Sequence, residues 1–182
     1  MSKSSKQSKL NIWVINLERF QKVILLINKL FIEQKTLVFD LDETLIRSEF
    51  RIKDGYDVKF YLNSRLSWTG RTPVFLYIRP YVYKMLQSLK NDFELIVFTA
   101  SVEEYANKIL KIIDKDQVFD HVLYRDQCIN NEKLKVMVKD LELLLGNRDL
   151  KDIVIIDNKA TSYLLNIENG IPIKNFVGDK SD

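Results

Sequence analysis

The sequence predicts an α/β fold in which helices flank a parallel β-sheet. Three short stretches, at residues 37–39, 94–98 and 153–156, are apolar apart from Glu94 and are typical of strands that are buried on both faces. Segments with helical spacing separate these runs, at residues 81–90, 102–113 and 140–145. Polar side chains follow each run directly. Because the carboxyl ends of parallel strands meet at one edge of a sheet, where open α/β folds build their sites, we expect these polar residues to form one site.

The first apolar run leads into two aspartates, Asp40 and Asp42. Side chains alternate with a period of two along a strand, so both carboxylates start on the same side, although the chain then turns at Glu43-Thr44. Two like charges this close repel each other unless a cation or a shared proton compensates. A Mg²⁺ ion meets that need, because it prefers oxygen ligands and commonly uses one or two carboxylates. A solvated turn with a capping aspartate is the alternative.

The second run ends in two hydroxyl side chains, Thr99 and Ser101, and the helical pattern begins directly after them. A hydroxyl at a strand end beside a helix N-terminus can bind a phosphate oxygen together with the free N–H groups of the helix. We assign this role to Thr99. Ser101 stands three residues before Glu104, the spacing of a capping box, so we expect Ser101 to cap the helix.

Later stretches add a guanidinium, an ammonium, a carboxylate and an amide. Arg125 follows a short strand pattern and suits planar, bidentate contacts to a peptide or a phosphate, with a surface salt bridge as the alternative. Lys139 precedes the third helical stretch. Asp157 and Asn158 follow the last apolar run and should reach the same sheet edge as Asp40.

An insert of about residues 47–78 separates the first run from the first helix. Polar and aromatic residues alternate in it, with Gly55 and Gly70 as turn residues, which predicts a short β-hairpin or a three-stranded flap. The insert is too short for a separate cap domain. We therefore expect an open site that favours a protein segment over a small metabolite, because enzymes that act on small esters need lids to exclude water.

The residues before the first run divide into a polar tail, 1–9, and a segment whose apolar residues recur every three to four positions, 10–32. This spacing predicts an amphipathic helix, which gives an N-terminal region of 1–34 and a domain of 35–182. Charged residues interrupt the segment, so it does not resemble a membrane span, and it lacks the cleavage site of a signal peptide. We expect it to lie on the domain, with a partner or a membrane surface as the alternative.

Composition limits the function further. A net charge of +3 is too mild to imply direct binding of nucleic acid. The single cysteine, Cys128, excludes an internal disulfide and fits a reducing compartment. A cysteine phosphatase would need an arginine six residues later, where Leu134 stands, so we interpret Cys128 as a small buried hydrophobe. The glycine spacing matches neither a Walker A nor a Rossmann nucleotide motif.

Four stretches together resemble a known family. They are DLDETLI at 40–46, FTAS at 98–101, KDL at 139–141 and IIDN at 155–158. Their order and spacing are similar to motifs I–IV of the haloacid-dehalogenase (HAD) superfamily, in the form used by the small C-terminal-domain phosphatases, or NLI-interacting-factor-like family. The resemblance covers residues 36–178 and implies a HAD-like fold, a Rossmann-like parallel sheet flanked by helices with a short β-hairpin insert instead of a full cap.

The resemblance implies a Mg²⁺-dependent serine/threonine protein phosphatase. In it, Asp40 would be the nucleophile and Asp42 the general acid and base, while Thr99 and Lys139 would stabilise the transferred phosphoryl group. The implied magnesium ligands are the side chains of Asp40 and Asn158 and the backbone carbonyl of Asp42, with Asp157 orienting them. Lys159 stands where the family commonly has a serine, which we expect to alter substrate preference.

The family reads proline-containing phosphopeptides, and the RNA polymerase II C-terminal repeat is the leading candidate that the resemblance implies. Phe50 and Val102 would belong to its apolar pocket, and Tyr105 and Arg125 would contact the peptide. We expect a monomer located in the nucleus or the cytoplasm. The family continues with helices beyond Gly178, so we expect a shorter or a truncated domain. A non-catalytic phosphopeptide-binding adaptor of the same fold, or a phosphatase of small phosphate esters, remains as an alternative.

Overall fold

The computed structural model describes residues 35–182 except 65, 66 and 147. The expected amphipathic helix at 10–32 lies outside the described residues and stays a prediction. Within the described part of the chain, no helix is both long enough and apolar enough to cross a membrane.

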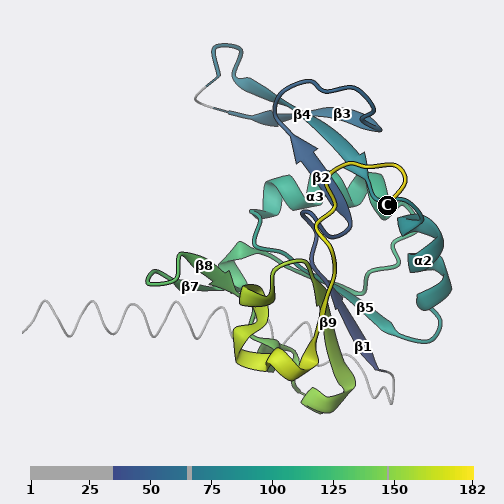
Figure 1. Cartoon of the computed structure of the whole chain (residues 1–182), viewed down its shortest axis with the longest axis vertical. Coiled ribbons are helices and arrows are strands. Elements are labelled where there is room, and N and C mark those ends of the chain that lie inside the picture. Colours follow the sequence, from purple (N-terminus) through teal and green to yellow (C-terminus); the bar gives the residue numbers. More distant parts are fainter. Residues whose placement is uncertain (1–34, 65–66, 147) are drawn as a thin grey trace, which may run out of the picture.

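A five-stranded parallel sheet forms the centre of the domain (Figure 1), which confirms the predicted α/β fold. In spatial order its strands are β10 (Gly170–Pro172), β9 (Ile153–Asp157), β1 (Thr36–Phe39), β5 (Glu94–Phe98) and β6 (His121–Leu123). Phe39, the last residue of β1, is in register with Val97 and with Ile156. The ends of the three predicted strands therefore lie level with one another, at one edge of the sheet.

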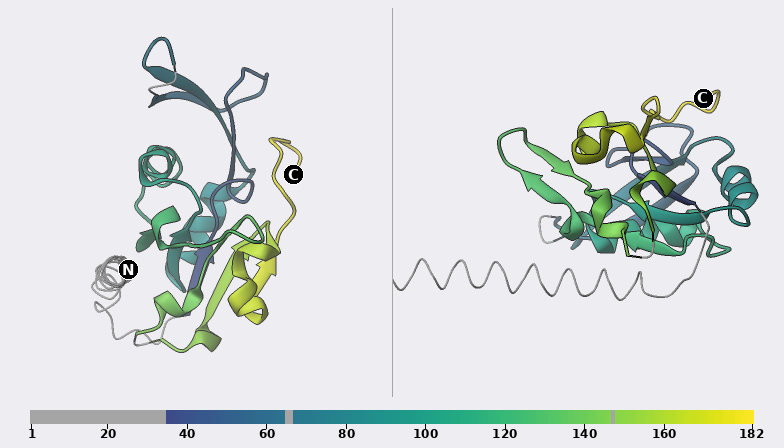
Figure 2. Two further views of the ribbon diagram at one scale, coloured as in Figure 1. Left: turned by 90° about the vertical axis from the view of Figure 1, so that its left-hand side faces the viewer. Right: turned by 90° about the horizontal axis from the view of Figure 1, so that it is seen from below.

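Both faces of the sheet are covered, on opposite sides in Figure 2. Phe39 contributes to the core on the face covered by α2 (Val82–Leu89) and α3 (Glu103–Ile113). Its neighbour Val38 contributes to the core on the other face, with the 3₁₀ helices η2 (Leu141–Leu144) and η4 (Ala160–Asn169). This alternation explains why the central strands are continuous apolar runs, because side chains on both faces of a covered sheet pack against a core.

The helix expected at 140–145 is the short 3₁₀ helix η2 rather than an α-helix. The Asp140 side chain accepts a hydrogen bond from the Glu142 N–H at 3.0 Å, and Gly146 follows with a φ of 110°. A local side-chain bond at the start and a left-handed glycine at the end leave room for little more than one turn. Two more 3₁₀ helices are present, η1 (Arg125–Gln127) and η3 (Leu150–Asp152).

The insert is a three-stranded antiparallel sheet in the order β2 (Ile46–Glu49), β4 (Arg71–Ile78) and β3 (Val58–Asn63). It confirms the predicted flap and extends away from the main sheet (Figure 1). Gly70, with a φ of 70°, directly precedes β4. A second small hairpin, β7 (Ile129–Asn131) and β8 (Val136–Val138), was not predicted; it projects beyond the main sheet (Figure 2) and leads directly to Lys139.

The C-terminal segment returns to the insert. Phe176 is fully buried against Phe75 and Tyr77 of β4, and its N–H donates to the carbonyl of Glu43 at 2.7 Å. Arg79 donates to the Asp182 carboxylate at 2.7 Å. The segment after β10 therefore fastens the insert beside the carboxyl edge of the main sheet.

Candidate active site

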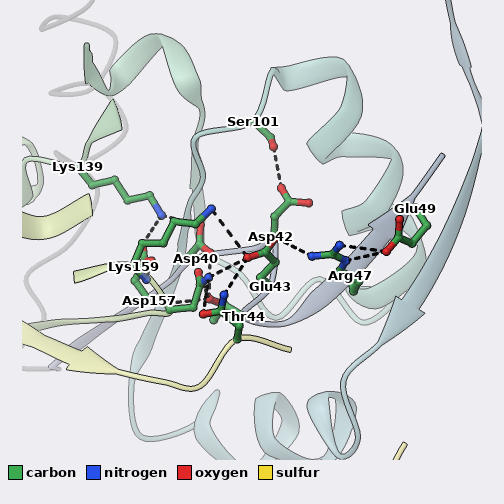
Figure 3. Close-up of polar contacts among 12 residues, drawn as sticks. Asp40, Asp42, Glu43, Thr44, Arg47, Glu49, Ser101, Lys139, Asp157 and Lys159 are labelled. Carbon is green, nitrogen blue, oxygen red and sulfur yellow. Dashed lines mark hydrogen bonds and ion pairs between the residues drawn. The ribbon is translucent and has the colours of Figure 1, made fainter. Parts of the chain in front are cut away.

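Four of the predicted residues, Asp40, Asp42, Lys139 and Asp157, lie together where β1, β5 and β9 end (Figure 3). After β1 the chain makes a tight turn in which the N–H groups of Leu45 and Ile46 donate to the carbonyl of Leu41, at 2.9 and 3.1 Å. Glu43 takes a left-handed conformation in this turn, with a φ of 64°. The turn carries Asp42 off the line of the strand, so the two aspartates acquire different neighbours.

Lys139 lies between two carboxylates. Its Nζ is 2.6 Å from Oδ1 of Asp40 and 2.6 Å from Oδ2 of Asp157, and all three residues are buried. Burial raises the pKa of Asp40 to about 6 against the opposing effect of Lys139, and Asp157 adds to the rise. Burial lowers the pKa of Lys139, but the two carboxylates outweigh it and raise this pKa above its ordinary value. The single positive charge of Lys139 thus compensates two carboxylates, so this buried cluster of three residues keeps an excess of negative charge.

The hydroxyl of Thr44 joins Asp40 to Asn158. It lies 2.9 Å from Oδ2 of Asp40 and 3.3 Å from Oδ1 of Asn158, and it accepts from the Asn158 N–H at 3.2 Å. A carboxylate oxygen of Asp40, which follows β1, and an amide oxygen of Asn158, which follows β9, therefore both lie beside the Thr44 hydroxyl. No role for Thr44 was predicted from the sequence, although its position four residues after Asp40 in the DLDETLI stretch was the available signal.

These residues fit a hard cation. Asp40 and Asn158 bring two oxygens together where negative charge is in excess, which is the donor type that Mg²⁺ prefers. Among the described residues, no three His, Cys, Asp or Glu side chains form a metal-binding group. A metal here would therefore need the Asn158 amide and backbone oxygens besides the Asp40 carboxylate.

Glu43 and Lys159 lie at the rim of the site. One oxygen of Glu43 accepts from Arg47 at 2.7 Å, and the other accepts from the amides of Asn158 and Asn175 at 3.3 Å each. Nζ of Lys159 is 4.0 Å from Glu43, and the Lys159 side chain is 59% exposed. Lys159 is therefore an exposed cation beside the residues that hold Asn158.

Asp42 binds hydroxyl groups rather than a cation. Ser101 Oγ donates to Oδ2 of Asp42 at 2.7 Å, and the Tyr105 hydroxyl donates to Oδ1. The prediction that Ser101 caps the following helix is wrong, because the cap residue of α3 is Val102 and it makes no side-chain capping bond. The physical reason is position: α3 begins one residue later than the capping-box pattern requires, and the Ser101 hydroxyl donates its hydrogen to Asp42 instead of accepting from a helix N–H.

Thr99 is buried at the end of β5, and its Oγ accepts from the Ser101 N–H at 3.0 Å. That bond does not use the hydroxyl hydrogen. The predicted phosphate-binding role of Thr99 therefore stays a prediction, with the side chain placed beside the sheet edge that carries Asp40.

The predicted peptide-binding residues lie in two kinds of environment. Phe50 and Val102 are exposed, and Arg125 is an exposed residue whose Nε donates to the Ala100 carbonyl at 2.6 Å. Tyr105 is buried, with its ring in the core and its hydroxyl on Asp42. The family resemblance implied that Tyr105 contacts the substrate, and the bond from Tyr105 to Asp42 was not predicted.

Cys128 lies behind the site, with Sγ 3.7 Å from the Thr99 carbonyl. Burial raises the pKa of its thiol to about 11. The thiol therefore stays protonated at neutral pH, although Cys128 is only partly buried and not the buried hydrophobe that its sequence context predicted.

Known proteins resemble this chain in sequence and in fold. The model of the NLI interacting factor-like phosphatase family matches residues 35–182. A probable C-terminal domain small phosphatase of Dictyostelium discoideum is 40% identical over 148 residues, which are 81% of this chain and 46% of that protein. The carboxy-terminal domain RNA polymerase II polypeptide A small phosphatase 2 of Mus musculus is 35% identical over 146 residues, 80% of this chain and 52% of that protein. The chain thus spans about half the length of these relatives.

The solved structure of Fcp1, an essential RNA polymerase II CTD phosphatase, is similar in fold. It has a TM-score of 0.62 and 25% identity, and the match covers 91% of this chain and 46% of that one. The resemblance inferred from the four motifs and the HAD-like fold are confirmed. The chain belongs to the NLI interacting factor-like phosphatase family.

Proposed function

We propose that this chain is a Mg²⁺-dependent phosphatase of phosphoserine or phosphothreonine in proteins that works through an aspartyl-phosphate. The observation that carries the proposal is the division of labour between two neighbouring carboxylates. Asp40 lies between the ammonium of Lys139 and the hydroxyl of Thr44, whereas Asp42, two residues later, is held by Ser101 and Tyr105. Carboxylates with such different partners can take different chemical roles.

In the first step Asp40 attacks phosphorus. A bond forms between an oxygen of Asp40 and phosphorus, the bond from phosphorus to the seryl or threonyl oxygen breaks, and Asp42 gives its proton to that oxygen. In the second step a water oxygen attacks phosphorus, Asp42 takes the proton of that water, and the bond to Asp40 breaks. Inorganic phosphate leaves, and both aspartates return to their starting states.

Two side chains stabilise the phosphoryl oxygens while charge develops on them. Lys139 is fixed between Asp40 and Asp157, so its positive charge is in place before the reaction begins. The hydroxyl of Thr99 donates from the end of β5. Asp40 and Asn158 would hold Mg²⁺ with side-chain oxygens and Asp42 with its carbonyl; a bound ion offsets the negative charge of the phosphoryl group.

The proposed substrate is a phosphorylated, proline-containing segment such as the RNA polymerase II C-terminal repeat, and the corresponding location is the nucleus or the cytoplasm. Two observations support a protein substrate. The insert is a small sheet rather than a cap domain, and Phe50 and Val102 stand exposed, as an apolar peptide pocket requires. The names of the relatives point to the same class of substrate.

The test is phosphate release by the full chain from a phosphoserine-proline peptide and from para-nitrophenyl phosphate, each with Mg²⁺ and with excess chelator. We expect release that needs Mg²⁺ and that Asp40→Asn abolishes. Asp149→Asn is the matched control, because the Asp149 carboxylate is exposed and its ion-pair partner among the described residues is Lys151. If the folded protein binds the peptide without releasing phosphate, it is an adaptor instead.

A further inference from the structure

Both carboxylate oxygens of Asp42 are held by hydroxyls from one short stretch of chain. Ser101, which precedes α3, donates to Oδ2 at 2.7 Å, and Tyr105, in the first turns of α3, donates to Oδ1. A carboxylate on a single bond can rotate freely. Two donors on its two oxygens fix the plane of the group as well as its position.

The hydroxyl of Tyr105 is itself fixed from a second direction. Its oxygen lies 2.8 Å from Oγ of Ser48 on β2, and its ring is part of the buried core. A phenol has one hydrogen, so Ser48 must donate to Tyr105 while Tyr105 donates to Asp42. The insert sheet and helix α3 therefore define together where this hydroxyl stands.

These contacts draw Asp42 to the α3 side of the site, away from Lys139. Asp40 binds Lys139 and Thr44, and Asp42 binds neither. Proton transfer is efficient only when the acid stands within hydrogen-bond reach of the leaving oxygen. A side chain that fixes Asp42 thus acts on proton transfer without touching the reacting atoms.

We infer that Tyr105 and Ser101 are positioning residues that hold Asp42 for proton transfer to the leaving oxygen, with Ser48 holding Tyr105. The inference rests on the proposed function. It gives Tyr105 a role different from the peptide contact that the family resemblance implies. It also gives the insert a part in the chemistry, since Ser48 belongs to β2.

The experiment compares substrates whose leaving groups differ in their need for a proton. Nitrophenolate leaves without one, whereas a seryl oxygen requires it. The value of kcat/KM reports the transition state relative to free enzyme and substrate. It therefore follows the step in which the ester bond breaks and is not obscured by slow hydrolysis of the aspartyl-phosphate. A series of aryl phosphates with leaving groups of increasing basicity extends the comparison.

Tyr105→Phe in the full chain should lower kcat/KM for a phosphoserine peptide by about tenfold or more, a part of the usual acid–base contribution. For para-nitrophenyl phosphate, kcat/KM of the same variant should change by less than about twofold, because loss of nitrophenolate needs little acid assistance. Across the aryl phosphate series, kcat/KM of Tyr105→Phe should fall more steeply with leaving-group basicity than kcat/KM of the parent chain. Ser101→Ala should act in the same direction, and Ser101→Thr, which keeps a hydroxyl, should restore the peptide rate.

Tyr124→Phe is the matched control. It removes a phenol hydroxyl that bonds to Asn107 of α3 at 2.8 Å rather than to Asp42. We expect it to leave both substrates unaffected.

Two results would overturn the inference. An equal loss for all esters would indicate a structural role only, and a higher KM for the peptide with unchanged dependence on the leaving group would indicate a substrate contact. Asp42→Asn separates this failure from that of the proposed function. Suppose that Asp42→Asn makes kcat/KM depend more steeply on leaving-group basicity and Tyr105→Phe does not. The positioning role of Tyr105 is then wrong, while the assignment of Asp42 as the general acid stands.

Discussion

Nζ of Lys139 lies 2.6 Å from Oδ1 of Asp40, and the two side chains come from positions 99 residues apart in the chain. Both are almost completely buried. Removing one partner of a buried ion pair leaves the other charge without compensation, which is much more costly than losing an exposed pair. Here the loss would leave two carboxylates, because Asp157 binds the same ammonium.

Lys139→Met should therefore lower the free energy of unfolding by about 3–5 kcal/mol at neutral pH, as measured by chemical denaturation. Adding Asp157→Asn should recover part of that loss, because it removes one uncompensated charge. Lys151→Met, which breaks an exposed pair with Asp149, is the control and should change nothing measurable. Equal stability of Lys139→Met and the control would contradict the buried bridge.

Ionisation of Asp40 should oppose folding in chelator. Burial raises its folded pKa to about 6, above the unfolded value, so the folded state binds the proton more tightly. The resulting cost is absent below about pH 4, grows as the pH rises towards 6, and is complete above it. Asp40→Asn should therefore be more stable than the parent at pH 7, by up to about 3 kcal/mol, with the difference shrinking between pH 6 and pH 4. Parallel stability curves from pH 4 to pH 7 would refute this prediction.

Cys128 should be dispensable and slow to react. With a thiol pKa of about 11, roughly one molecule in a thousand carries a thiolate at pH 8. Iodoacetamide should therefore modify the folded protein far more slowly than the urea-unfolded protein, as followed by mass spectrometry. Cys128→Ala should retain phosphate release. Rapid alkylation of the folded chain, or loss of turnover in the variant, would show that this thiol has a role.

Lys159 should select for acidic substrates. Its ammonium is exposed at the rim of the site, and its distance of 4.0 Å from the Glu43 carboxylate makes a weak ion pair that leaves the charge available to a substrate. Lys159→Ser should raise KM about two- to fivefold for a phosphopeptide with an acidic residue beside the phosphoserine, since exposed charge pairs contribute little. A peptide with a neutral residue at that position should be unaffected, and added salt should reduce the difference. An identical change for both peptides would remove the proposed selectivity.

Local pattern was sufficient to predict the main features of the site. The apolar runs before Asp40, Thr99 and Asp157 predicted three buried strands, and the parallel arrangement placed these residues at one edge. It was not sufficient for Ser101. A serine three residues before a glutamate satisfies the local rule for a capping box, but the nearby carboxylate of Asp42 accepts the hydroxyl instead. No local rule includes a partner 59 residues away.

The sequence by itself determined the parallel α/β fold, the small insert and the two aspartates after the first strand. The reason is that the spacing of apolar residues and the polar residues after each strand are local features, which neighbouring positions in the chain show directly. Only the tertiary structure decided which groups those aspartates bind. Lys139 reaches Asp40 from a hairpin that no pattern predicted, and Tyr105 reaches Asp42 across 63 residues of chain. The physical reason is that packing of the sheet, α3 and the insert sets these partners, and packing depends on contacts between segments that are distant in sequence.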